Sequence, residues 1–232
     1  VVQDPFNSFY DADIVYRFIQ LIEKLGFKPV LLPFKPNGKP SHIKGFLTKF
    51  AKTAQNSADF LNKLHSLGMP MVGLDPALVL CYRDEYKEAL GQKRGNFEVK
   101  LANEWLVDAI EHYPKIIKDV PAEFTWFSHC TESTAKPNTA KEWQSIFNHF
   151  GAKVTSLNLG CCGMAGTYGH ELENLDRSKA LFEMSWQSSI EKIAEKEQIL
   201  VSGYSCRSQV KRFAKFSPKH PIEALLMLLN NH

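Results

Sequence analysis

The sequence has no apolar run long enough to cross a membrane, and it has no strong charge of either sign. Its longest apolar stretches, such as residues 70–80, fall well short of the roughly 20 residues that a membrane-spanning helix requires. Lysine and arginine number 28 against 25 aspartate and glutamate residues, a net charge of +3. Such a small excess gives no support to nucleic-acid binding. We therefore expect neither a transmembrane segment nor a nucleic-acid partner.

The sequence also lacks an initiator methionine, a signal-peptide pattern and a disulfide framework. Its five cysteines are odd in number and unevenly placed, unlike those of small secreted domains. We therefore expect a piece of a longer protein from a reducing, cytoplasmic compartment. One local excess of positive charge lies between Arg207 and Lys219. It is typical of a solvated surface, and the alternative is that it faces an acidic partner or an anionic substrate.

An internal duplication divides the chain. A shift of 125 residues lays residues 26–28 on 151–153 and Gly38 on Gly163 without a gap. With four more residues inserted, residues 72–77 fall on residues 201–206. Identities are few, but the order of the expected elements agrees with this alignment, which predicts two similar halves.

The same pattern of strands and helices occurs in both halves. In the first, apolar residues at three- and four-residue spacing predict a helix over residues 14–25. A strand over 28–32, a helix over 42–67 and a strand over 69–74 are expected to follow. In the second half we expect strands over 124–128, 153–157 and 199–201, helices over 139–150 and 177–196, and a closing helix over 222–229.

Strands that alternate with helices predict an α/β fold with parallel sheets and right-handed crossovers. We expect two pseudo-symmetric small βαβ halves, joined by a helical connection over residues 96–121. Residues 1–95, called half one below, have no cysteine cluster. Residues 122–232, called half two, carry the cysteine cluster and the closing helix.

Four of the five cysteines follow predicted strands of half two. Cys130 follows the first strand, Cys161 and Cys162 follow the second, and Cys206 follows the third. Because the carboxyl ends of parallel strands meet at one edge of a sheet, we expect these four thiols to converge. Cys81 lies in an apolar stretch without a partner and is expected to be an ordinary buried residue.

Thiolates gathered at one point are suited to an iron-sulfur cluster or to zinc. The adjacent pair Cys161 and Cys162 favours the cluster, because neighbouring residues do not easily direct both sulfurs to one tetrahedral ion. Gly163 supplies a backbone that can turn its amides toward sulfur. A vicinal disulfide and ordinary buried thiols are the alternatives that stay open.

Two histidines and two carboxylates are further candidates at the same edge. His129 precedes Cys130 and His170 follows the glycine-rich turn, so each could orient a ligand or donate to sulfur. Ordinary polar packing is the alternative for both. Asp4 and Asp75 end strands of half one and are expected to line the same crevice, where a substrate carboxylate could meet one of three cations, Lys39, Arg83 or Arg207.

These residues carry a resemblance to a known family. Cys130, Cys161-Cys162-Gly163 and Cys206 resemble the cysteine-rich CCG domain, which occurs twice in one subunit of heterodisulfide reductase and in the iron-sulfur subunits of glycolate oxidase and anaerobic glycerol-3-phosphate dehydrogenase. Residues 161–169, 205–209 and 220–221 resemble the C-terminal part of FAD-linked oxidases fused to iron-sulfur modules. Residues 4–6, 31–46 and 72–86 are similar to the bacterial D-2-hydroxyglutarate dehydrogenases among them. The match covers nearly the whole chain.

The resemblance implies an iron-sulfur cluster at Cys130, Cys161, Cys162 and Cys206, with zinc as the alternative. It implies FAD in the parent protein, flavin and ferredoxin-like domains as partners, and electron transfer to an unknown acceptor through which the protein could associate with a membrane. The competing function is a structural or docking module without a redox role. The chain has no G-x-G-x-x-G loop and no Cys-x-x-Cys-x-x-Cys run, so it should not oxidise a hydroxy acid alone.

The sequence departs from the family pattern in both halves. Gln209 stands where the second cysteine of the closing pair is expected. In half one the alignment places Pro5, Pro36, Asn37 and Ala77 opposite the four cysteines, so that half has no thiol ligand. We therefore expect one metal site rather than a double one.

Overall fold

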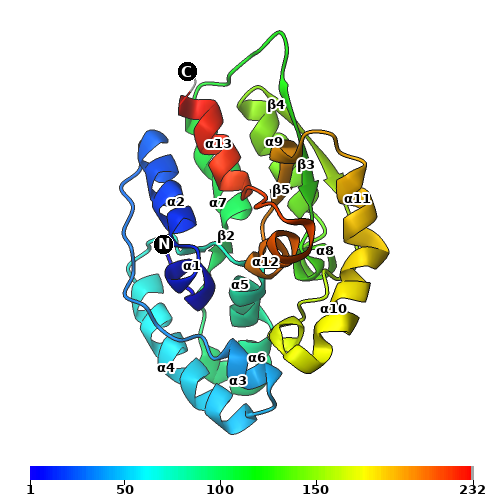
Figure 1. Cartoon of the computed structure of the whole chain (residues 1–232). Coiled ribbons are helices and arrows are strands. Elements are labelled where there is room, and N and C mark those ends of the chain that lie inside the picture. The colour runs from blue at the N-terminus through cyan, green and yellow to red at the C-terminus, as the bar shows by residue number, and fades with distance from the viewer. Residues whose placement is uncertain (231–232) are drawn as a thin grey trace.

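Two small parallel sheets organise the chain, as a computed structural model of residues 1–230 describes it (Figure 1). β1 (Val72–Gly73) of half one pairs with β2 (Lys100–Leu101), which belongs to the connection. In half two, β3 (Ala122–Phe127) lies between β4 (Ala152–Leu157) and β5 (Ile199–Val201). Every one of these pairs is parallel. The predicted α/β fold with two halves is confirmed.

Helices cover both sheets. In half one they are α1 (Pro5–Phe9), α2 (Ala12–Lys24), α3 (Lys39–Ile43), α4 (Leu47–His65), α5 (Pro76–Arg83) and α6 (Glu85–Leu90), and α7 (Ala102–Ala109) follows β2. In half two they are α8 (Cys130–Ala135), α9 (Thr139–His149), α10 (Leu175–Phe182), α11 (Ser188–Glu191), α12 (Tyr204–Gln209) and α13 (Pro221–Asn230). Short 3-10 turns lie at Gly91–Arg94, Ile110–His112, Tyr168–His170, Leu172–Asn174 and Lys196–Gln198, and π-turns at Glu183–Gln187 and Val210–Ala214.

The duplication is visible in the hydrogen bonds. The Val1 nitrogen donates to the Val30 oxygen at 2.6 Å, and the Leu32 nitrogen donates to the Val1 oxygen at 3.0 Å. This pattern of hydrogen bonds makes Leu31 the partner of Val1, as in a parallel sheet. Adding 125 to both numbers gives Trp126 and Ser156, which are register partners in β3 and β4. The strand expected over residues 28–32 is thus an extended segment beside Val1, and not a regular strand.

The starts of the helices refine the alignment between the halves. Asp4 precedes α1 and His129 precedes α8, in agreement with the shift of 125. Asp75 precedes α5 and Gly203 precedes α12, which corresponds to a shift of 128 rather than 129. Leu78, and not Ala77, therefore lies opposite Cys206.

Three expected helices differ from the structure. The helix expected over residues 42–67 is interrupted at Gly45, whose φ of +78° lies in the left-handed region, so that α3 and α4 are separate. The helix expected over 177–196 contains the π-turn and ends at Glu191. The connection begins with β2, which joins the sheet of half one, before α7 provides the expected helical part. No helix within residues 1–230 is both long and apolar enough to cross a membrane.

The two halves share one hydrophobic core. The apolar face of α2 packs against α13, the closing helix of half two, and Phe18 at its centre is fully buried. The same cluster contains β1 and α7 residues from the first part of the chain, and β3, β4, β5 and α9 residues from the second. The relative position of the halves is therefore fixed by buried apolar contacts.

We expect Phe18→Ala to lower the free energy of unfolding by about 3–5 kcal/mol, because it removes a large side chain from a packed site. Urea denaturation measures this loss. Tyr16→Ala on the same helix is the control, since Tyr16 is 60% exposed, and its change should stay within about 0.5 kcal/mol. Equal losses in both variants would contradict the shared core.

Candidate functional site

The ends of three parallel strands bring four cysteines of half two to one edge of the sheet. Cys130 opens α8 after β3, the Cys161-Cys162 pair lies in the loop after β4, and Cys206 lies on α12 after β5. Cys162 and Cys206 are buried, Cys161 is half-buried and Cys130 is exposed. Cys81 is fully buried in the separate apolar cluster of half one, as expected.

Neighbouring thiols of the site shift one another's pKa values. Hydrogen bonds from Cys130 and then Cys162 lower the pKa of Cys161, and the backbone amides of Gly163 and Ala165 act in the same direction. The pKa of Cys162 is raised, first by Cys161 and then by Cys206. Interaction with Cys161 is also the main cause of the raised pKa of Cys130. Cys161 is therefore the thiol of the group that most readily carries a negative charge.

The thiols are neighbours, but they do not surround a common point. Within residues 1–230, no three cysteine, histidine or carboxylate side chains adopt an arrangement that could hold a metal ion. The donor set nevertheless has the chemistry of a soft metal site, because it combines four sulfurs with backbone N–H groups aimed at sulfur. The residues present thus fit an iron-sulfur cluster or zinc by donor type, and not by their ligation geometry.

Gly163 shapes the turn that follows the adjacent cysteines. Its nitrogen donates to the Cys161 sulfur at 3.3 Å, and its φ is +86°. A Cβ atom at this position would lie 2.2 Å from the carbonyl oxygen of Ser178. Only glycine therefore permits this turn, which agrees with the expectation that it directs amides toward sulfur.

Two buried side chains, Gln209 and Ser178, hold the turn at Cys162 and Gly163 by hydrogen bonds, and we call this pair the clamp. The Gln209 side chain donates through Nε2 to the Cys162 carbonyl at 2.9 Å and to the Ser178 hydroxyl at 2.8 Å. The Ser178 hydroxyl donates in turn to the Gly163 carbonyl at 2.8 Å. Gln209 and Ser178 are both fully buried. The clamp thus ties α10 and α12 to the turn, and Ser178 was not recognised in the sequence.

The two candidate histidines have different surroundings. His129 is buried, accepts a hydrogen bond from the Thr131 nitrogen at the start of α8, and contacts the Ser205 hydroxyl at 3.3 Å. Burial is the main cause that lowers its pKa. It connects the residues beside Cys130 and Cys206, which suits a positioning role. His170 is exposed at the end of a short 3-10 turn.

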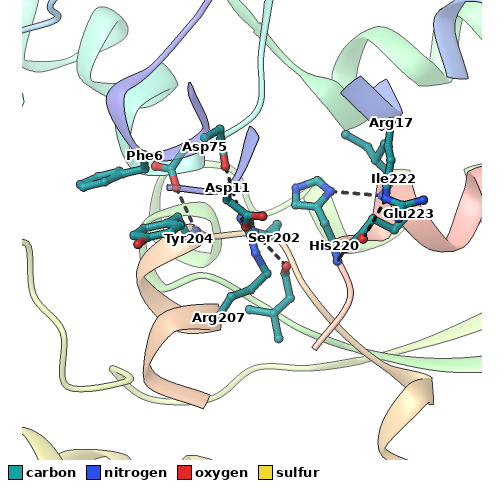
Figure 2. Close-up of polar contacts among 12 residues, drawn as sticks. Phe6, Asp11, Arg17, Asp75, Ser202, Tyr204, Arg207, His220, Ile222 and Glu223 are labelled. Carbon is teal, nitrogen blue, oxygen red and sulfur yellow. Dashed lines mark hydrogen bonds and ion pairs between the residues drawn. The ribbon is translucent and has the colours of Figure 1, made fainter. Parts of the chain in front are cut away.

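Half one holds the helix that carries Cys206 (Figure 2). A carboxylate oxygen of Asp75 accepts the Tyr204 N–H at 3.0 Å, and the Phe6 ring stacks on Tyr204 with centroids 5.0 Å apart. Arg207 is buried and donates to Asp11 at 3.0 Å and to Asn7 at 3.3 Å. Those two bonds come from Nη2, whereas Nη1 donates to the carbonyls of Val201 and Ser202 at the end of β5. These contacts fix α12 against α1 and β5.

Two buried carboxylates at the starts of α1 and α8 have raised pKa values. Burial raises the pKa of Asp4 to about 6, with a further contribution from the Asp75 charge. Burial also raises the pKa of Glu132 to about 8. Glu132 accepts hydrogen bonds from the Ser202 hydroxyl and from the His129 nitrogen, so it connects the ends of β5 and β3. No pattern in the sequence indicates Glu132, because an acidic residue in a first helical turn is usually exposed.

The three cations considered for a substrate carboxylate all have acidic partners within the chain. Arg83 pairs with Glu104, Lys39 pairs with Glu85, and Arg207 pairs with Asp11. Arg207 is also the only one of the three on a helix that bears a site cysteine. Their roles in this structure are therefore structural contacts between segments of the chain.

Comparison with known proteins agrees with the geometry of half two. Residues 124–211 match the family model of the CCG cysteine-rich domain. Half two therefore contains a CCG domain. The matched range includes all four cysteines of the site, the Gly163 turn and Gln209, and it begins and ends within half two.

The whole chain is similar to much longer dehydrogenases. It is 56% identical over 230 residues to D-2-hydroxyglutarate dehydrogenase of Escherichia coli (strain K12) and 42% identical over 226 residues to that of Pseudomonas putida. These matches cover 99% and 97% of this chain but 22% of each relative. One subunit of the anaerobic glycerol-3-phosphate dehydrogenase of E. coli is 25% identical over 196 residues, 83% of this chain and 49% of that protein. The chain thus spans about a fifth of the two D-2-hydroxyglutarate dehydrogenases.

We expect Gln209→Met to lower the free energy of unfolding by about 1–3 kcal/mol, because the Cys162 carbonyl and Ser178 hydroxyl lose a buried donor. Chemical denaturation measures the loss. The matched control is Gln144→Met on the exposed side of α9, which should change stability little. Hydrogen exchange should show the added opening at the Cys162 turn, and its absence there would argue against the clamp.

We expect Asp4→Asn to reduce the pH dependence of stability between about pH 4 and 6. The folded-state pKa of Asp4, about 6, exceeds its ordinary value of 3.8, so the folded protein holds a proton that the unfolded chain has released. The contribution is complete below about pH 4 and is lost as pH rises toward 6, by up to about 2 kcal/mol. Urea titrations across this range measure it. Asp13→Asn, at an exposed position of α2, should leave the slope unchanged.

Proposed function

We propose that this chain is the cysteine-rich module of a larger FAD-dependent D-2-hydroxyacid dehydrogenase, with D-2-hydroxyglutarate as its substrate. In this proposal it takes part in electron transfer from the flavin to an acceptor in a reducing, cytoplasmic compartment. The observation that supports it most is that four cysteines follow the carboxyl ends of three parallel strands at the edge of one sheet, with the amides of Gly163 and Ala165 lowering the pKa of Cys161. The similarity to the dehydrogenases named above supports the substrate class.

Cys130, Cys161, Cys162 and Cys206 would be the ligands of an iron-sulfur cluster, which supplies one-electron chemistry when it is bound. The protein's contribution is to hold these sulfurs and to stabilise their charge. The amides of Gly163 and Ala165 stabilise negative charge on Cys161. The Gln209 and Ser178 clamp fixes the turn, and His129 connects the segments that carry Cys130 and Cys206.

A zinc-binding or metal-free docking module of the same oxidoreductase is the second candidate. Two observations favour it: half one contributes no thiol to the site, and three ligand groups do not meet at one point within the described residues. In this case the cysteines would maintain the fold, and the surface would serve the flavin domain.

Anaerobic reconstitution with iron and sulfide separates these functions. We expect iron and sulfide in equal amounts, about two or four of each per chain, because four cysteine ligands serve both common cluster types. Cys161→Ser and Cys206→Ser should lose more than half of both. Cys81→Ala is the control, because Cys81 lies in the core of half one and should leave the content unchanged.

Metal and sulfide analysis together give the decisive outcomes. Stoichiometric zinc without sulfide would support the docking module and contradict electron transfer. Full iron and sulfide in a chain that lacks Cys161 would contradict the assignment of the ligands.

A further inference from the structure

An apolar groove opens beside Val1 in half one. One wall is the extended segment of residues 28–30, and the other is formed by residues 69–71 ahead of β1. Ile22 of α2, Trp105 of α7 and Leu64 of α4 complete the lining. Phe27, Val30 and Met69 at its walls are each more than a third exposed, which is unusual for large apolar side chains that lie together.

Half two shows what occupies the equivalent place. There, residues 122–125 form the first part of β3; all four pair with β4, and Thr125 also pairs with Ile199 at the start of β5. Val1 corresponds to Trp126, so residues 122–125 have no counterpart within this chain. Their register partners in β4 correspond to residues 27–30, which form the first wall of the groove. The groove is therefore the place of the first half of a central strand.

The backbone at the walls is oriented for such a strand. The Val30 oxygen accepts from Val1, so the Val30 N–H points to the same side, toward the groove. That N–H has no hydrogen-bond acceptor among residues 1–230. The Val72 oxygen accepts from the Val2 nitrogen at 2.8 Å, so the Val72 N–H faces the groove from the other wall. Pro29, which has no N–H, alternates to the outer edge and leaves the pairing unobstructed.

We propose that an extended segment of the longer protein, joined directly to Val1, fills this groove and completes the central strand of half one. The segment runs parallel to both walls. The carbonyl of its last residue accepts from the Val72 N–H, and the carbonyl of the preceding residue accepts from the Val30 N–H. Apolar side chains from three helices, Ile22, Leu64 and Trp105, line the groove, so the segment is predominantly apolar.

Two further observations agree with this occupant. The dehydrogenase relatives are several times longer than this chain, so the parent protein has residues to supply. Burial lowers the pKa of the Val1 amino group to about 6, which shows that a charged end is disfavoured at this position. A peptide bond to a preceding residue is neutral and removes that cost.

The test compares two extended chains with the chain that begins at Val1. One carries the four residues that precede Val1 in the parent protein, and the control carries Gly-Ser-Gly-Ser. We expect only the native extension to slow amide exchange at Val30 and Val72, by about tenfold or more. It should also protect Trp105 from acrylamide, because the other three tryptophans are no more than 2% exposed.

Two results would overturn the proposal. Equal exchange rates at Val30 and Val72 in both extended chains would show that the preceding residues do not enter the groove. Protection that rises with protein concentration in the chain without an extension would identify a second copy as the occupant. Neither result depends on the metal site, so the proposed function is tested separately.

Discussion

The position of the helix that carries Cys206 depends on a buried polar contact between the halves. Arg207 extends from the helix of Cys206 to Asp11 and Asn7 of half one, while it also holds the carbonyls at the end of β5. Removing either side of such a contact leaves buried polar groups without partners, which costs more than the contact contributes as a pair. The arrangement therefore specifies one position of α12 relative to β5. The place of Cys206 among the other thiols follows from that position.

A second contact between the halves explains how a half without thiols remains important to the cysteine site. Asp75 follows β1 as Gly203 follows β5, but its carboxylate accepts from the first N–H of α12 in the other half. Gly203 has no side chain with which to do so, and a Cβ there would lie 2.2 Å from the His129 ring. The helix of Cys206 thus receives its cap from half one. Half one contributes no thiol to the site, but it supports the half that does.

The sequence predicts the plan of the fold better than its local details. The strands of half two and the helices α2, α9 and α13 lie close to their predicted ranges, because their apolar periodicity matches their burial. The short helices α1 and α5 were missed, although Asp4-Pro5 and Asp75-Pro76 are recognisable helix starts. The interruption at Gly45 requires a left-handed residue, and a single glycine in a helical pattern does not reveal one.

The sequence predicts the strand-end positions of the site's cysteines, but it does not predict the residues that hold these cysteines in place. Strand ends locate Cys130, Cys161, Cys162 and Cys206 because parallel topology alone brings them together. Ser178 and Glu132 depend on the exact packing of α10 and α8, which no spacing in the sequence encodes. The sequence pattern marks Gln209 only as the position of an absent cysteine, whereas its amide has a structural role of its own.

The hydrophobic core that runs through both halves makes the CCG domain a unit of sequence but not a unit of folding. Residues 124–211 exclude α13 and α2, whose packed faces close the core next to the sheet of half two. A protein cut to those residues would expose the inner side of its own sheet to water. The boundaries of the matched CCG range therefore differ from the boundaries of the packed core, which needs α2 of half one and α13 to cover the sheet of half two.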